Sequence, residues 1–331
     1  MIIESRAYAR AGLLGNPSDG YFGKTISIIV RNFGAIISLY ESPELIIEPQ
    51  VADSHKFSSI YHLIESLNLS GYYGGDRLIK AAIKKFHEYC DKNNIRLANR
   101  NFTIRYQSSI PRQVGLAGSS AIVTATMKAL MKFYGVDIPV QILPSVILAA
   151  ETEELGINAG LQDRVIQVYE GCVYMDFNKT YLLKHQHGKY ESINPQHLPK
   201  LYLAYKTQLG KVSGKVLNTI KQRYDAGDKQ VIATLNEIAA LAQKGKDVIL
   251  NHEYDLLNEM INRNFDLRCK IMQISESNLE MVKTARDCGA SAKFSGSGGA
   301  IIGMYRDDEM LRKLILALNK INARVIKPYI S

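Results

Sequence analysis

The chain has 331 residues, of which 46% are hydrophobic and 22% are charged, and its formal net charge is +9 at pH 7. This composition is typical of a globular protein with a large core, and it excludes a disordered or collagen-like chain. No apolar run approaches the roughly 20 residues of a membrane helix, so we expect no transmembrane segment.

The positive charge is compatible with a generally basic surface, with attraction of anionic ligands or with nucleic-acid binding. Lysines and arginines are dispersed along the chain without an aromatic-interleaved basic block, which makes nucleic acid the least favoured partner. The first residues lack the basic segment of a signal peptide. The four cysteines show no Cys-x-x-Cys spacing. Both features are typical of a reducing compartment, so we expect a cytoplasmic protein.

The first half of the chain alternates strand and helix patterns. Alternating β-branched runs predict strands, and apolar residues at helical spacing predict helices. Strands are expected over residues 2–14, 25–39, 44–49 and 102–106. Helices are expected over residues 77–93, 122–134 and 141–154. Residues 165–176 are mostly strand-forming in composition, and we expect a strand there.

The second half is predominantly helical. A polar, turn-rich region at 178–200 predicts a boundary between two domains, residues 1–190 and 191–331. Beyond it, helices are expected over residues 213–224, 229–245, 253–269, 277–288 and 308–322. Strands are expected over residues 201–205, 292–295, 300–305 and 323–329. This mixture predicts an α+β fold.

The segment 111–121, PRQVGLAGSSA, is a Gly/Ser-rich turn that opens directly into a helix. Such a turn brings several unpaired backbone N–H groups and the positive end of the helix dipole to one point, which favours phosphate. The simpler interpretation is a helix N-cap, because Ser is a favoured cap residue and Gly suits the preceding turn. Two further small-residue loops, at 9–25 and 293–300, are also joined to apolar strands. Together the three loops predict one site assembled from distant parts of the chain.

In this order, the three segments resemble the three motifs of the GHMP kinases, which phosphorylate sugars, mevalonate and homoserine with ATP. The resemblance implies a two-domain GHMP kinase fold, with an N-terminal ribosomal protein S5 domain 2-like part and a C-terminal ferredoxin-like α/β part. Within the family, the segments GLLGNPSD at 12–19 and AGLQDR at 159–164 are most similar to those of glucuronokinases.

The resemblance also implies catalytic and metal-binding roles. Asp163 matches the catalytic aspartate, and Arg10 matches the cation that keeps this aspartate ionised. Ser120 and Glu151 match the oxygen ligands of Mg²⁺. Simpler interpretations are an acidic helix end for Glu151, a surface ion pair between Asp163 and Arg164, and a structural ion pair for Arg10.

The remaining expected contacts concern the phosphates and the sugar. For the ATP phosphates, the motifs imply contacts from Pro111, Gly115, Leu116, Ala117, Gly118, Ser119, Ser120, Ala121, Gly296, Ser297 and Gly298. For the substrate, they imply contacts from Asp19, Tyr21, Arg112, Arg164 and Gly299.

Other assignments stay open at this point. A carboxylate on the substrate would require a basic residue, and Arg112, Arg164 and Lys215 are the open choices. Lys293 is an extra candidate for the site. The adenine pocket is expected to draw on Tyr72 and Tyr73.

The expected function is an ATP- and Mg²⁺-dependent sugar-1-kinase that converts D-glucuronate to D-glucuronate 1-phosphate and feeds nucleotide-sugar synthesis. One alternative is another GHMP sugar kinase, acting on galacturonate, arabinose, galactose or a heptose phosphate. A second alternative, of a different class, is a catalytically silent member that binds a sugar or RNA. The expected partners are therefore ATP and a small sugar or sugar acid, with no membrane and no nucleic acid.

Overall fold

The computed structural model describes residues 2–49, 74–207 and 214–331 and the side chains of all of these except 214–219. The larger of two sheets has the strand order β3-β4-β2-β5-β6, with β1 paired to β2. All its pairs are antiparallel except β3 with β4. The strands are β1 (Ile2–Leu14), β2 (Lys24–Ser42), β3 (Ile46–Glu48), β4 (Asn101–Ser108), β5 (Cys172–Asp176) and β6 (Lys189–Ile193).

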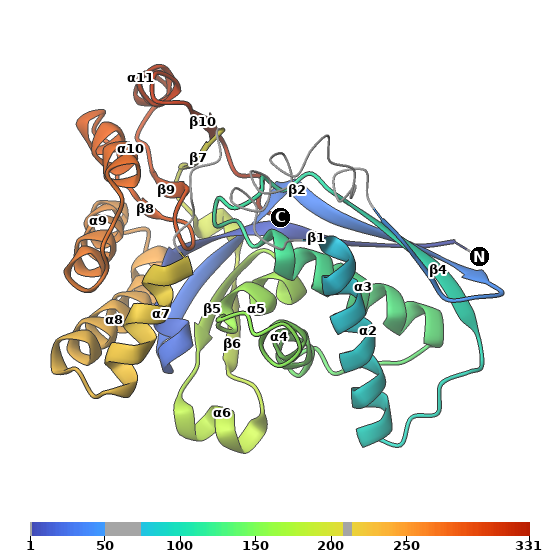
Figure 1. Ribbon diagram of the computed structural model, residues 1–331. Coiled ribbons are helices and arrows are strands. Elements are labelled where there is room, and N and C mark those ends of the chain that lie inside the picture. Colours follow the sequence, from blue (N-terminus) through green and yellow to red (C-terminus); the bar gives the residue numbers. More distant parts are fainter. Residues whose placement is uncertain (1, 50–73, 208–213) are drawn as a thin grey trace, which may run out of the picture.

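Helices cover one face of this sheet (Figure 1). α3 packs on β1 and β2, and α2 packs on α3. In α2 the buried Leu78, Ala82 and Phe86 recur at helical spacing, so an amphipathic face makes this contact. The elements are η1 (Ser18–Tyr21), α2 (Gly75–Lys92), α3 (Gly118–Tyr134), α4 (Leu143–Thr152), α5 (Gln162–Tyr169), α6 (Lys179–His185) and η3 (Pro195–His197).

The second sheet has the order β10-β7-β9-β8. Its strands are β7 (Leu201–Lys206), β8 (Lys293–Phe294), β9 (Ala300–Met304) and β10 (Ala323–Ile326). Its helices are α7 (Gly214–Asp225), α8 (Lys229–Leu250), α9 (Tyr254–Ile271), α10 (Glu276–Asp287) and α11 (Asp308–Asn319). Helices connect β7 to β8 and β9 to β10, and all three strand pairs are antiparallel. This is the ferredoxin-like arrangement, so the α+β expectation is confirmed.

The apolar core runs continuously from one sheet to the other. Leu13 of β1, Ile26 of β2 and Ile302 of β9 belong to the same buried cluster, as does Ile249 of α8. Gly245 of α8 lies directly against Leu14, where a larger residue would collide. The end of β1 is therefore fixed between the two parts of the chain. Among the described helices, none is both long and apolar enough to cross a membrane.

Two sequence-based expectations need correction. Residues 165–176 do not form one strand: their first part belongs to α5, and only Cys172–Asp176 is a strand. The β-branched Val165 and Ile166 favoured a strand, but they form the buried face of a helix that ends where Glu170 and Gly171 both adopt positive φ.

The expected boundary region also contains regular structure, α6 and β6. The proposed division between residues 190 and 191 falls inside β6, which pairs with β5 of the larger sheet. We therefore propose a boundary between β6 and β7.

Candidate active site

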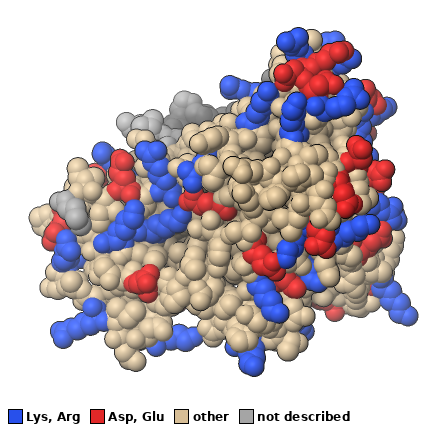
Figure 2. Space-filling model, turned by 180° about the vertical axis from the view of Figure 1, so that it is seen from behind, with Lys and Arg blue, Asp and Glu red and all other residues tan. Residues whose placement is uncertain are grey.

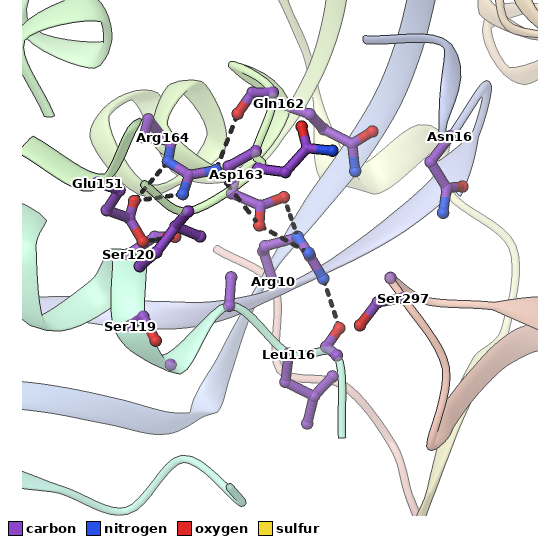
Figure 3. A pocket seen from close by; sticks show the side chains of 18 of the residues that line it. Arg10, Asn16, Leu116, Ser119, Ser120, Glu151, Gln162, Asp163, Arg164 and Ser297 are labelled. Atoms are coloured by element: carbon purple, nitrogen blue, oxygen red, sulfur yellow. Dashed lines mark hydrogen bonds and ion pairs between the residues drawn. The ribbon is translucent and has the colours of Figure 1, made fainter. Parts of the chain in front are cut away.

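A cleft of about 1010 Å³ is lined by all three motif segments (Figure 3). Of the expected site residues, Ala121, Gly298 and Gly299 are not part of its lining. Tyr72 and Tyr73 lie outside the described residues, as does the side chain of Lys215. The expected residues that line the cleft are Arg10, Asp19, Tyr21, Pro111, Arg112, Gly115, Leu116, Ala117, Gly118, Ser119, Ser120, Glu151, Asp163, Arg164, Gly296 and Ser297.

Arg10, on β1, joins the three motifs. Its Nε and Nη2 donate to the two carboxylate oxygens of Asp163 at 2.6 and 2.8 Å. Its Nη1 donates to the backbone oxygens of Gly115 at 2.6 Å and of Ser295 at 3.2 Å. Arg10 is 5% exposed and the Asp163 side chain is 20% exposed, so this bidentate pair is a partly buried, charge-assisted interaction. The geometry fixes Asp163 relative to both glycine-rich loops.

Asp163 lies in the first turn of α5, where the helix dipole also favours a negative charge. Burial by itself raises the pKa of this carboxyl, but Arg10 and Arg164 outweigh it and hold the pKa below its usual value. Asp163 is therefore ionised at neutral pH. A surface ion pair with Arg164 does not describe it, because the closer partner is the buried Arg10.

The Gly/Ser-rich turn of segment 111–121, here called the phosphate-type loop, leads into α3, which begins at Gly118. The residue before it, Ala117, has φ of 61°, and no side chain caps the helix. Ser119 and Ser120 lie inside the first turn, so the N-cap interpretation of these serines is wrong. This N-terminus lines the cleft, and the positive end of the helix dipole favours an anion there.

Ser120 and Glu151 meet beside this helix end. The Ser120 hydroxyl donates to Glu151 Oε1 at 3.3 Å, and the carboxylate is 1% exposed. Burial raises the pKa of Glu151, and the ion pair with Arg164 opposes this shift. The Nε of Arg164 donates to Glu151 Oε2 at 2.7 Å, and its Nη1 donates to the backbone oxygen of Gly160 at 2.8 Å. Arg164 is thus engaged by the protein, although sequence reasoning placed it on the substrate.

The third loop closes against the phosphate-type loop. A Cβ at Gly115 would lie 2.8 Å from the backbone oxygen of Gly298, and Gly115 has φ of +69°. A Cβ at Gly296 would lie 2.8 Å from Nη1 of Arg10. Glycine is required at both positions because the two backbones and Arg10 share one small space. A Cβ at Gly299 would lie 2.9 Å from Cα of Val114, so this glycine takes part in the same packing.

The first loop, around η1, carries Asp19 and Tyr21. Burial and the neighbouring Asp163 raise the pKa of Asp19 to about 6. Lys293 does not line the cleft. It is 1% exposed, and it donates to the backbone oxygen of Gly12 at 2.7 Å and to the side chain of Asn16. Lys293 therefore holds the first loop in place through hydrogen bonds, without lining the cleft itself.

Sequence reasoning missed two buried polar residues of the cleft, Gln162 and Arg268, each 2% exposed. Arg268 is carried by α9, far from any motif. The available signal was its place in the apolar stripe of that helix, since Leu257, Ile261 and Asn264 precede it on the same face. A charged residue in such a stripe is rarely fully buried unless it is paired.

Comparison with known proteins identifies the family. A profile described as GHMP kinases N terminal domain matches residues 77–171, and one described as GHMP kinases C terminal matches residues 239–323. Glucuronokinase 1 of Arabidopsis thaliana is 46% identical over 306 residues, which cover 91% of this chain and 84% of that protein. Probable glucuronokinase 2 of the same plant is 46% identical over 308 residues, with the same coverage.

A solved structure has the same fold. Phosphomevalonate kinase of Streptococcus pneumoniae, in complex with phosphomevalonate and AMPPNP, superposes with a TM-score of 0.78 at 15% identity. The match covers 99% of this chain and 100% of that one. The two profiles and the 46% identity together establish that the chain belongs to the GHMP kinases, a family of phosphotransferases that act on alcohol groups.

Proposed function

We propose that the protein is a sugar-1-kinase that transfers the γ-phosphate of ATP to the anomeric hydroxyl of D-glucuronate. The observation that carries this proposal is the bidentate Arg10–Asp163 pair, which lies beside an uncapped helix N-terminus in one cleft. The 46% identity to a glucuronokinase supports the choice of sugar. The product, D-glucuronate 1-phosphate, is suited to nucleotide-sugar synthesis.

In this reaction the anomeric oxygen attacks the γ-phosphorus as the bond to the β,γ-bridging oxygen breaks and ADP leaves. Asp163, held ionised by Arg10, accepts a hydrogen bond from the anomeric hydroxyl and takes its proton. The same pair fixes the carboxylate orientation, which is the main demand of phosphoryl transfer on a protein. The backbone N–H groups between Gly115 and Ser120 hold the ATP phosphates at the start of α3.

The oxygen donors beside α3 fit a Mg²⁺ ion held largely by ATP. Ser120 and Glu151 offer two hard oxygens next to the phosphate-type loop. The described residues contain no cluster of three acidic, histidine or cysteine ligands. Mg²⁺ is usually held by one or two carboxylates with phosphate oxygens and waters, so this donor set suffices. Ser120 and Glu151 would hold the ion, which would neutralise negative charge on the phosphates, and Arg164 orients the Glu151 carboxylate.

The test is ADP release from MgATP with a panel of acceptors: glucuronate, galacturonate, glucose, galactose, arabinose, mevalonate and no sugar. We expect selective turnover of glucuronate. Turnover of another sugar would retain the kinase chemistry and overturn the substrate. Absence of turnover across the panel, with ATP still bound, would favour a silent sugar- or RNA-binding member.

The distribution of charge does not favour RNA. On the face seen in Figure 2, Lys and Arg side chains are interspersed with Asp and Glu rather than gathered in one basic block. We also propose a cytoplasmic location, which agrees with the four unpaired cysteines.

A further inference from the structure

Arg268 is a buried cation that forms no ion pair with the residues that the structure describes. Its Nε donates to the sulfur of Met272 at 3.0 Å, and its guanidinium carbon lies 5.1 Å from the centre of the Phe294 ring. Its Nη1 finds no acceptor among the described residues. None of the carboxylates that the structure describes forms an ion pair with it. A buried guanidinium is normally paired, because an uncompensated buried charge is strongly unfavourable.

The helix that carries Arg268 fixes where its side chain lies. Asn264, one helical turn earlier on α9, accepts from the backbone N–H of Gly15 at 2.8 Å and donates to the backbone oxygen of Asn16 at 3.2 Å. Residues four apart share one face of a helix, so Arg268 faces the same first loop. It lines the cleft there, and Asp19 counteracts the effect of burial on its pKa.

The other basic residues that line the cleft are less suited to hold a ligand carboxylate. Arg10 and Arg164 are each committed to a carboxylate of the protein. Lys221 pairs with Asp225 at 3.0 Å and is exposed, and Arg112 is exposed on the phosphate-type loop.

We infer that Arg268 is the residue that binds the carboxylate of the sugar acid and so selects a uronic acid over a neutral sugar. This inference rests on the proposed function. In a hexuronic acid the anomeric carbon and the carbon that bears the carboxylate flank the ring oxygen. The anomeric hydroxyl is held at Asp163, on α5 of the N-terminal part, and the carboxylate reaches α9 of the C-terminal part. Asp19 lies close enough to Asp163 and to Arg268 for electrostatic interaction with each. In this arrangement Asp19 would contact the ring hydroxyls between them.

The position of Arg268 also argues against the ATP phosphates as its anion. The phosphate-type loop and its helix α3 belong to the N-terminal part, where the helix N-terminus favours phosphate. Arg268 approaches the cleft from the first loop, where the family resemblance places the sugar. A guanidinium also matches a carboxylate in a bidentate pair, which an amide or hydroxyl in its place cannot form.

The test compares D-glucuronate with D-glucuronamide, in which a neutral amide replaces the carboxylate, for the wild-type enzyme and Arg268→Met. We expect the wild type to prefer glucuronate in kcat/KM by about 100-fold, the size expected for a buried charge pair. In Arg268→Met this preference falls to about onefold, mainly through a higher KM for glucuronate. Arg263→Met is the matched control, because Arg263 lies on the same helix but pairs with Glu237 at the surface. It keeps the wild-type preference.

Affinity for an ATP analogue and the thermal unfolding midpoint report whether the fold survives. If Arg268→Met does not fold, Arg268→Lys carries the test, and it loses at least about tenfold of the preference because the bidentate fork is gone. An unchanged preference in a folded variant overturns the role of Arg268 while glucuronate remains the substrate. A wild type that turns over neither glucuronate nor glucuronamide overturns the proposed function itself.

Discussion

The two sides of the cleft differ in how their charges are balanced. We call them the phosphate side, around Glu151 and Asp163, and the sugar side, around Arg268 and Gln162, after the proposed positions of ATP and the sugar. On the phosphate side, Glu151 is paired with Arg164, and Asp163 is paired with Arg10. On the sugar side, Nη1 of Arg268 and Oε1 of Gln162 are both buried and without a hydrogen-bond partner among the described residues. Buried polar atoms are nearly always satisfied, so exceptions call for an explanation.

This difference indicates that different residues of the cleft determine turnover and substrate specificity. The side chains of the phosphate side are already paired and oriented. Phosphoryl transfer requires such preorganised groups to stabilise the charge that develops in the transition state. On the sugar side, we expect a polar ligand to supply the missing hydrogen-bond partners of Arg268 Nη1 and Gln162 Oε1. Specificity for one sugar is therefore expected to depend on Arg268 and Gln162, and turnover on Asp163 and Arg10. Each prediction below tests one side of this division.

The largest effect is expected on the phosphate side, from Asp163→Asn. The amide keeps the shape but cannot take the proton of the anomeric hydroxyl, so kcat is expected to fall by about 10³-fold. Affinity for an ATP analogue is expected to remain within about twofold, because the group acts mainly during transfer. Steady-state ADP release and equilibrium binding check the two statements. Unchanged turnover would contradict the assignment of Asp163.

A smaller effect is expected from Glu151→Gln. The Mg²⁺ concentration for half-maximal rate should rise at least about tenfold, because a charged ligand is lost. Removing the buried partner of Arg164 should also lower the free energy of unfolding by about 3 kcal/mol. Magnesium titration of the rate and denaturant unfolding measure these changes.

Glu153→Gln is the matched control for this variant. Glu153 directly follows α4, and its side chain is 64% exposed in an ion pair with Lys85. This variant should change neither quantity, because an exposed ion pair contributes little. Equal effects of the two substitutions would show that Glu151 has no special place in the site.

The sequence predicted the phosphate side better than the sugar side, for a physical reason. The phosphate side is built from short local patterns, such as the Gly/Ser-rich turn before α3, whose chemistry can be read from neighbouring residues. Arg268 is brought to the cleft by long-range packing of α9; the apolar stripe of this helix indicates that Arg268 is buried, but not which site it reaches. The helix α5 was missed because Val165 and Ile166 favour strands, and tertiary packing overrode that preference. Arg164 was considered for the substrate because an Arg can pair with a carboxylate, and its partner in the structure, Glu151, is supplied by another helix.

The smallest effect is expected on the sugar side, from the pH dependence of Asp19. Its pKa of about 6 means that the carboxylate becomes protonated below pH 6 and accepts hydrogen bonds from the sugar less well. The value of kcat/KM for glucuronate should then fall by about tenfold between pH 7 and pH 5, following the ionised fraction of Asp19. Asp19→Asn should have a lower value at pH 7 and lose this slope. A slope that persists in the variant would assign it to another group.

Unfolding through the same group would not explain such a fall. The folded pKa of Asp19 is raised above the ordinary value of 3.8, so protonation favours the folded state. The contribution of Asp19 to stability therefore decreases as pH rises through 6 and increases as pH falls. Thermal unfolding at pH 5 and pH 7 separates the loss of substrate binding from any loss of structure.

The most direct test of the central claim is the structure of the product. The wild-type enzyme is incubated with MgATP and D-glucuronate, and the reaction is followed by phosphorus and proton nuclear magnetic resonance. We expect one phosphomonoester whose phosphorus couples to the anomeric proton, formed in equal amount to ADP. A phosphate on another hydroxyl, or ADP formed only with inorganic phosphate, would contradict a glucuronate 1-kinase.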